Sequence, residues 1–289
     1  VKPGTTEANE DDPERHLRTA LEVAERRGWK SGLVATARIV HATPAAFSAH
    51  RANRHSYEAI ARDMSQSGVD VLVGGGKRYF RDRSDGADLI EEMAGEGFTV
   101  ASSREEFESA SGVAERLVGL FADKDPPGVD RGERVVDLAE AASGAIRVLG
   151  RENERGFFLM VEGSQIDWRE HDLSPVSTIK ETLDFDRAVG RVLEYARGRD
   201  DTVVVVVADH ETGGLSILDR EAREQYREVL GGEDKIGQMV AHQGQDPAKA
   251  PDPMPVMARQ DGGQGEALVP VFGHLSLASR KYVEESEDF

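Results

Sequence analysis

Residues 156–172 read GFFLMVEGSQIDWREHD, and this stretch decides the fold. The apolar run 157–161 has the length and the β-preference of a central strand. Strands that are apolar throughout belong to parallel sheets that helices cover on both faces. Because ligands collect beyond the carboxyl ends of such strands, the polar residues from Glu162 onwards are the first candidates for a functional site.

The rest of the chain alternates between amphipathic helical segments and short apolar segments. This pattern predicts an α/β fold, a three-layer α/β/α sandwich with a mostly parallel central sheet. We expect a single domain over residues 1–289, with an insertion at 220–265 where the sequence turns charged and then rich in Gly, Pro and Gln. The expected helices are 17–27, 56–64, 88–93, 135–149 and 175–197, and the expected strands are 31–36, 69–73, 98–101, 157–161, 201–208 and 268–272.

The composition narrows the classes of protein to which the chain can belong. Its 54 acidic and 36 basic residues give a net charge of −18, which argues against a nucleic-acid-binding surface and predicts a solvated acidic coat typical of salty habitats. No apolar run approaches the ~20 residues that a membrane span needs. Because the chain has no cysteine, a metal would be held by imidazole, carboxylate and hydroxyl groups. The chain starts at Val1 without a signal-peptide pattern, so we expect a mature form or a fragment.

Two short segments combine carboxylates with imidazoles. Asp167 and His171 are four residues apart and share one face of a helical turn, so they can chelate one zinc ion. Asp209 and His210 directly follow a valine-rich run and can hold a second metal. An isolated pair of this kind is more often a solvated carboxylate beside a hydrogen-bonded histidine. Two pairs, each at the end of an expected central strand, favour metal binding instead.

A third segment offers groups suited to magnesium and to phosphate. Thr43 follows the expected strand 31–36 and provides a hard oxygen for magnesium, although a threonine before Pro44 is also a usual helix N-cap. Arg54 lies eleven residues further on, and its planar guanidinium matches the paired oxygens of a phosphate. Without the neighbouring motifs, a surface arginine would be the simpler interpretation of Arg54.

Five segments of the chain together resemble the alkaline phosphatase family, and they occur in the family's order. The resemblance runs from about Val1 to about Phe272. The segments are VATARIVHATPAAFSAH (34–50), DVLVGGGKRYF (70–80), FFLMVEGSQIDWREHD (157–172), TIKETLDFDRAV (178–189) and VVVVADHETGGLSI (204–217).

The resemblance implies an activity and a set of site residues. The implied activity is metal-dependent hydrolysis of phosphate monoesters at alkaline pH through a phosphoserine intermediate, by a periplasmic or secreted homodimer with a crown-like insertion at 220–265. The implied cofactors are two zinc ions and one magnesium ion. The implied residues are Asp167 and His171 for one zinc ion, Asp209 and His210 for the other, Glu162 and Thr43 for magnesium, and Arg54 as the catalytic, substrate-binding arginine.

The chain also departs from the family pattern at several positions. The family's serine nucleophile and a bridging aspartate are expected before residue 1. Within the chain, Ser31, Ser48 and Ser164 are weak substitutes, because none of them has the nucleophile's place in the motif order.

Further departures concern the surroundings of the metals. Gln264 aligns with a histidine that is a third zinc ligand in the family, and His242 or His274 are the alternatives for that role. His41 and Trp168 stand where family members have other residues beside the metals. We expect His41, Trp168 and Gln264 to contact the metal ligands rather than the metals themselves.

Two other functions stay open from the sequence. A phosphodiesterase or sulfatase relative on the same scaffold fits less well, because Arg54 and the run from Glu162 to His171 follow the monoesterase pattern. The other is a non-catalytic derivative that binds metal or phosphate. Two departures favour it: no serine within the chain has the nucleophile's place in the motif order, and Gln264 stands where the family has a zinc-binding histidine.

Overall fold

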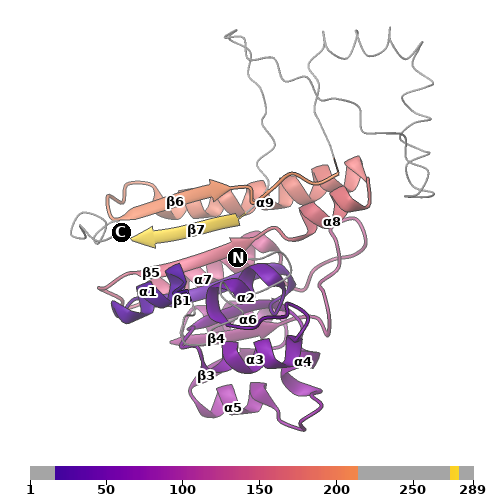
Figure 1. Cartoon of the computed structure of the whole chain (residues 1–289). Helices are drawn as coiled ribbons and strands as arrows, with labels where there is room; N and C mark the ends of the chain where they lie inside the picture. Colours follow the sequence, from indigo (N-terminus) through magenta and orange to yellow (C-terminus); the bar gives the residue numbers. More distant parts are fainter. Residues whose placement is uncertain (1–16, 214–273, 280–289) are drawn as a thin grey trace, which may run out of the picture.

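The computed structural model describes residues 17–213 and the strand at 274–279 (Figure 1). The expected insertion at 220–265 and the expected strand at 268–272 lie outside the described residues, as do Gln264 and His242. None of the described helices combines the length and the apolarity that crossing a bilayer requires.

Seven strands form one sheet in the described part of the chain. They are β1 (Lys30–Arg38), β2 (Val71–Gly75), β3 (Phe98–Ala101), β4 (Arg116–Leu120), β5 (Phe157–Glu162), β6 (Thr202–Val207) and β7 (His274–Ser279). Their order across the sheet is β3-β4-β2-β1-β5-β7-β6. The five strands from β3 to β5 pair in parallel, whereas β7 runs antiparallel to both β5 and β6. The mostly parallel sheet predicted from the sequence is therefore confirmed.

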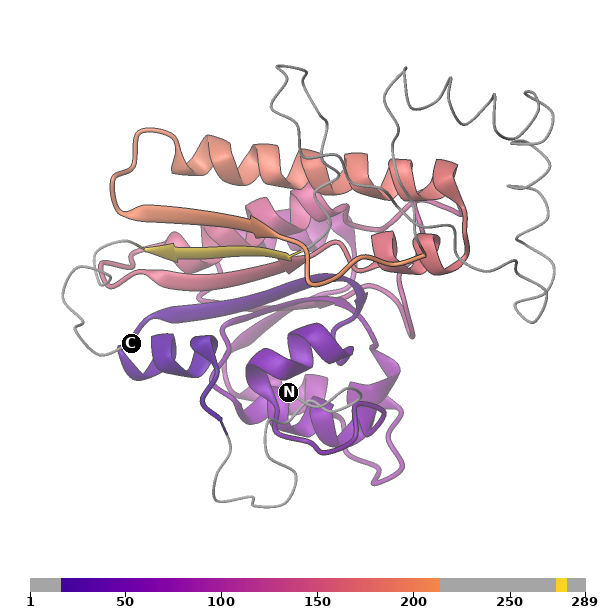
Figure 2. The ribbon, with the colours of Figure 1, turned by 45° about the horizontal axis from the view of Figure 1, so that its top comes forward.

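Helices cover both faces of this sheet, which gives the three layers (Figure 2). They are α1 (Ala20–Arg26), α2 (Ala42–Ser48), α3 (Tyr57–Gln66), α4 (Arg78–Arg81), α5 (Leu89–Gly95), α6 (Arg104–Ser111), α7 (Leu138–Gly150), α8 (Gln165–His171) and α9 (Pro175–Ala196). Neighbouring residues of β1 point to opposite faces: Leu33 joins the core under α1 to α5, and Val34 joins the core under α6, α7 and α9. Continuous apolar strands are thus explained by burial on both sides.

Capping residues correct two of the expected helix boundaries. The helix expected from residue 135 begins at Leu138, because Asp137 and Glu140 form a capping box: each carboxylate accepts a hydrogen bond from the other residue's backbone N–H. Thr19 and Glu22 form a second capping box at the start of α1, which was expected to begin at residue 17: the hydroxyl of Thr19 and the carboxylate of Glu22 each accept from the other residue's backbone N–H.

Two interior strands of the sheet, β4 and β7, were not predicted from the sequence. β4 reads RLVGL and lies between β3 and β2. It is short, starts with an arginine and contains a glycine, so its local signal is weak. Its pairing on both edges stabilises it instead.

The loop between β4 and α7, residues 121–137, is tied to α9 by buried charges. Arg134 donates to the carboxylates of Glu181 (2.6 Å) and Asp184 (2.5 Å), and all three side chains are almost fully buried. Glu181 also accepts a hydrogen bond from the backbone N–H of Val129. Two buried carboxylates thus share one buried guanidinium. Removing this cation would leave Glu181 without a charged partner and Asp184 with Arg187 alone.

We predict that Arg134→Ala lowers the free energy of unfolding by about 3–5 kcal/mol, the usual cost of leaving a buried charge without its partner. Urea unfolding followed by circular dichroism measures the change. Arg131→Ala is the matched control, because Arg131 is 60% exposed and its pair with Asp172 is solvated, so that loss should stay below about 1 kcal/mol. Equal unfolding midpoints for the two variants would contradict the prediction.

Candidate functional site

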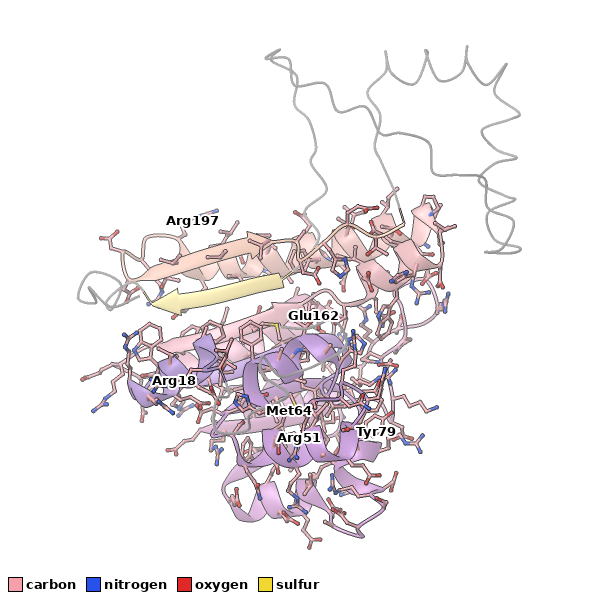
Figure 3. All side chains as sticks on the ribbon, viewed as in Figure 1. Arg18, Arg51, Met64, Tyr79, Glu162 and Arg197 are labelled. Atoms are coloured by element: carbon pink, nitrogen blue, oxygen red, sulfur yellow. The ribbon has the colours of Figure 1, made fainter. Side chains whose placement is uncertain are left out.

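The candidate site lies where two neighbouring parallel strands end. β1 and β5 pair with Ala35 opposite Glu162, so the segments that follow them leave the sheet side by side. Glu162 is the last residue of β5 and is buried at this edge (Figure 3). A cavity of about 150 Å³ opens here, and the polar side chains around it belong to His41, Thr43, Arg54, Glu162, Ser164, Asp167, Trp168, Glu170, Asp209, His210 and Thr212.

A larger hollow, of about 460 Å³, lies at the opposite edge of the sheet. Arg147, Tyr195 and Thr202 are among the residues around it, near the beginnings of β5 and β6. It brings together none of the paired ligand groups found in the sequence, and ligands of parallel sheets collect at carboxyl ends. The smaller cavity is therefore the better candidate.

Of the residues predicted from the sequence, those that line the cavity are Thr43, Arg54, Glu162, Asp167, Asp209 and His210, together with His41 and Trp168. His171 does not line it, and its side chain is 69% exposed. Gln264 lies outside the described residues.

The turn between β1 and α2 presents Thr43. The N-cap of α2 is His41, and Thr43 lies within the first helical turn, so the N-cap role considered for Thr43 is wrong. Arg38, the last residue of β1, holds the start of this turn. Its backbone N–H (2.9 Å) and its guanidinium (2.8 and 2.5 Å) donate hydrogen bonds to the carboxylate of Asp125 in the 121–137 loop. The loop therefore sets the position from which Thr43 reaches the cavity.

His41 is held as a neutral imidazole. Burial, together with the charges of the nearby guanidinium groups of Arg54 and Arg38, lowers its pKa to about 4. Its Nδ1 atom is buried and has no hydrogen-bond partner among the described residues. Trp168 packs against the ring edge to face, with 5.6 Å between the ring centroids. A neutral, buried imidazole with an open nitrogen is a group that accepts a hydrogen bond or a cation.

The two carboxylate–imidazole pairs come from different elements. In α8, Nε2 of His171 lies 3.5 Å from Oδ1 of Asp167. After β6, Nε2 of His210 lies 3.2 Å from Oδ2 of Asp209. Nitrogen and oxygen ligands lie about 2.0–2.1 Å from a tetrahedral zinc ion, which places two of them about 3.4 Å apart. Both pairs therefore have the spacing of two ligands on one metal.

Neither pair is a complete metal site by itself. Among the described residues, no three imidazole or carboxylate side chains are arranged to hold one ion. Each pair fits a metal only with further ligands. His274, one alternative for a third ligand, begins β7, where its Cα pairs with those of Glu162 and Val207.

Two site residues were missed in the sequence analysis. Thr212 is buried and donates from Oγ1 to Oδ1 of Asp167 (2.6 Å). Glu170 is also buried; burial raises its pKa to about 7, with help from the charges of Asp167 and Glu211. Both residues stand within segments that the sequence had singled out, but their contacts depend on how α8 packs against the chain after β6.

The three serines considered as substitute nucleophiles have different surroundings. Ser31 donates to the carboxylate of Glu25 (2.6 Å), and Ser48 donates to the backbone oxygen of Pro44 (3.2 Å). Ser164 lines the cavity, and its buried hydroxyl has no hydrogen-bond partner among the described residues.

The fold and this site define a class of protein. A parallel α/β sheet with carboxylate, imidazole and guanidinium groups gathered at its carboxyl edge is typical of metal-dependent phosphoryl-transfer enzymes. The family model described as alkaline phosphatase matches residues 4–251. The chain belongs to the alkaline phosphatase family.

Individual relatives agree with this assignment. Alkaline phosphatase 3 of Bacillus subtilis (strain 168) is 39% identical over 214 residues, which cover 72% of this chain and 45% of that protein. The alkaline phosphatase from the Antarctic bacterium TAB5 is 39% identical, with a TM-score of 0.64 over 70% of this chain and 58% of that one. A variant of the TAB5 enzyme, also 39% identical, has a TM-score of 0.61 over 68% of this chain and 56% of that one, and has magnesium bound in its M3 site. The chain thus spans about half the length of the relatives it matches.

We predict that Asp125→Ala lowers the free energy of unfolding by about 1–3 kcal/mol, because it leaves the Arg38 guanidinium and a backbone N–H without their acceptor. Chemical denaturation measures this loss. Asp123→Ala is the control in the same loop, since Asp123 is 71% exposed and its pair with Lys77 should contribute less than about 1 kcal/mol. A larger loss for Asp123→Ala would show that the Arg38–Asp125 pair does not hold the turn.

Proposed function

We propose that this chain forms the metal-binding and phosphate-binding part of an enzyme that hydrolyses phosphate monoesters at alkaline pH. One observation carries the proposal: Thr43, Arg54, Glu162, Asp167, Asp209 and His210 come from four separate parts of the chain and line one cavity. A solvated surface would not gather the Asp209–His210 pair, the carboxylate of Asp167, a buried carboxylate and a guanidinium around the same space.

The proposed cofactors are two zinc ions and one magnesium ion. Asp167 and His171 would hold one zinc ion, and Asp209 and His210 the other, in keeping with the 3.5 and 3.2 Å spacings. Glu162 and Thr43 offer the oxygen ligands that magnesium prefers. When bound, these metals lower the pKa of an attacking oxygen and stabilise negative charge on the leaving oxygen.

The remaining residues would bind and orient the phosphate. Arg54 lines the cavity, and its guanidinium can donate two parallel hydrogen bonds to phosphate oxygens. The low pKa of His41 keeps that ring neutral, so it does not compete with Arg54 for the anion. Trp168, packed on His41, limits the movement of the ring at the cavity wall.

The chemistry would follow a phosphoserine route, with the serine and a bridging aspartate supplied from before residue 1. We further propose a single domain over residues 1–289 with a crown-like insertion at 220–265, assembled as a homodimer in the periplasm or outside the cell. Sedimentation velocity on the full chain tests the assembly: a single species of monomer mass would contradict the homodimer.

We predict that Arg54→Ala weakens binding of inorganic phosphate by about 10–100-fold, the loss expected for charge-assisted hydrogen bonds worth 1.5–3 kcal/mol. Isothermal titration with phosphate, in the presence of zinc and magnesium, measures the change. Arg191→Ala is the control, because Arg191 is exposed on α9 and pairs with Glu194 in the same helix. Equal phosphate affinity in both variants would remove Arg54 from the site.

We predict that added zinc raises the melting temperature of the chain and that Asp209→Ala abolishes most of the rise. At a zinc concentration of 100 times Kd, binding to the folded state adds about 2.7 kcal/mol to stability. Asp201→Ala is the matched control, because Asp201 precedes the other end of β6. If both variants respond to zinc as the wild type does, the pair after β6 is not a ligand.

Hydrolysis of a chromogenic aryl phosphate at alkaline pH, with zinc and magnesium, tests the activity. The comparison is between this chain, its Asp209→Ala variant and a version extended upstream. We expect turnover in the extended version. Turnover in the present chain would assign the nucleophile to a residue within it, and inactivity of both versions would favour a non-catalytic metal-binding or phosphate-binding protein.

A further inference from the structure

One threonine contacts both proposed zinc-binding pairs. The hydroxyl Oγ1 of Thr212 lies 2.6 Å from Oδ1 of Asp167 and 3.1 Å from Nδ1 of His210. Thr212 is 6% exposed, so water does not compete freely for these contacts. Asp167 belongs to α8 and His210 follows β6, and the two stand 43 positions apart in the sequence. A single hydroxyl therefore joins two elements that each bring one pair.

The direction of these hydrogen bonds follows from the donors available. A carboxylate only accepts, so the hydroxyl proton of Thr212 goes to Asp167. The hydroxyl has no second proton, so Nδ1 of His210 must donate to Oγ1. Nδ1 also lies 3.1 Å from the backbone oxygen of Glu211, another group that only accepts. Both contacts thus place the proton of the neutral ring on Nδ1.

This tautomer determines which nitrogen of His210 can bind a metal. With the proton on Nδ1, Nε2 carries a lone pair, and Nε2 is the atom 3.2 Å from Oδ2 of Asp209. Two lone pairs at this separation repel each other unless a cation lies between them. On the other side, the hydroxyl occupies one acceptor position of Asp167 Oδ1, the same oxygen that lies 3.5 Å from Nε2 of His171.

We propose that Thr212 is a positioning residue for both zinc sites: its hydroxyl orients the carboxylate of Asp167 and fixes the Nδ1–H tautomer of His210. This role rests on the proposed metal centre, and the tautomer can be tested separately in the metal-free chain. Groups that hydrogen-bond to metal ligands commonly change metal affinity by 10–100-fold when they are removed.

The backbone around Thr212 is held against α8 as well. The backbone N–H of Thr212 donates to the carboxylate of Glu170. The next residue, Gly213, has φ +73°, and a Cβ there would lie 2.6 Å from the carbonyl oxygen of Glu170. A glycine is therefore needed for this close approach, and the approach brings the hydroxyl of Thr212 to Asp167.

The test compares Thr212→Val, which removes only the hydroxyl, with Thr212→Ser, which keeps it. Zinc affinity of the full chain is measured by titration against a competing chelator, with zinc alone as the probe. We expect Thr212→Val to raise the zinc Kd by about 10–100-fold and Thr212→Ser to restore it to within about 3-fold of the wild type. Thr202→Val, at the start of β6, is the matched threonine control and should leave the Kd unchanged.

The tautomer is read separately, by long-range ¹H–¹⁵N NMR of the metal-free chain at a pH where histidine is neutral, with His210→Gln to assign the signals. We expect the Nδ1–H pattern for His210, and an Nε2–H pattern would overturn the proposal. Zinc binding that Asp209→Ala weakens but Thr212→Val leaves unchanged would overturn the role of Thr212 alone. A wild-type chain that binds no zinc would overturn this role together with the proposed metal centre.

Discussion

The parallel pairing of β1 with β5 is the interaction on which the rest of the structure depends. Its register sets Ala35 opposite Glu162, and both strands then end at the same edge of the sheet. Every later feature of the site uses this edge: the turn that carries His41 and Thr43, the helix that carries Asp167, and the buried carboxylate of Glu162. A shift of one residue would turn the buried side chains of either strand towards the opposite core and would separate these groups.

The 121–137 loop fixes the elements around that edge, and several of its contacts are made by buried charged groups. It holds the end of β1 through Arg38 and Asp125, it holds α8 where the amide of Gln165 donates to the backbone oxygen of Pro126, and it holds α9 through Arg134. Burying charges of this kind contributes little net stability compared with apolar packing, but breaking them is expensive. A loop tied in this way has few alternative conformations, which suits a segment that fixes three elements around the site.

Much of the fold could be predicted because its signals are local. The apolar runs of β1, β2 and β5 and the long amphipathic pattern of α9 lie within short windows of sequence. β4 was missed because its stability comes from two neighbouring strands rather than from its own five residues. The same limit applies to the site. Asp167 and Asp209 were recognisable from their motifs, whereas the contact of Thr212 with Asp167 and those of Arg134 with α9 join residues 45 to 50 positions apart. No local pattern predicts such contacts, because they arise only when separate elements pack.

The negative charges around the cavity couple metal binding to the packing of the elements that carry the ligands. Carboxylates crowd at this edge strongly enough that Asp167 and Glu211 help raise the pKa of Glu170. In the absence of a cation, the hydroxyl of Thr212 offsets part of this repulsion by donating to the carboxylate of Asp167. A cation bound at each pair would offset the carboxylate charge directly, so metal binding and the packing of the chain after β6 against α8 should stabilise each other. The fold therefore holds several carboxylates close together around the cavity, and a bound metal ion would neutralise part of their negative charge.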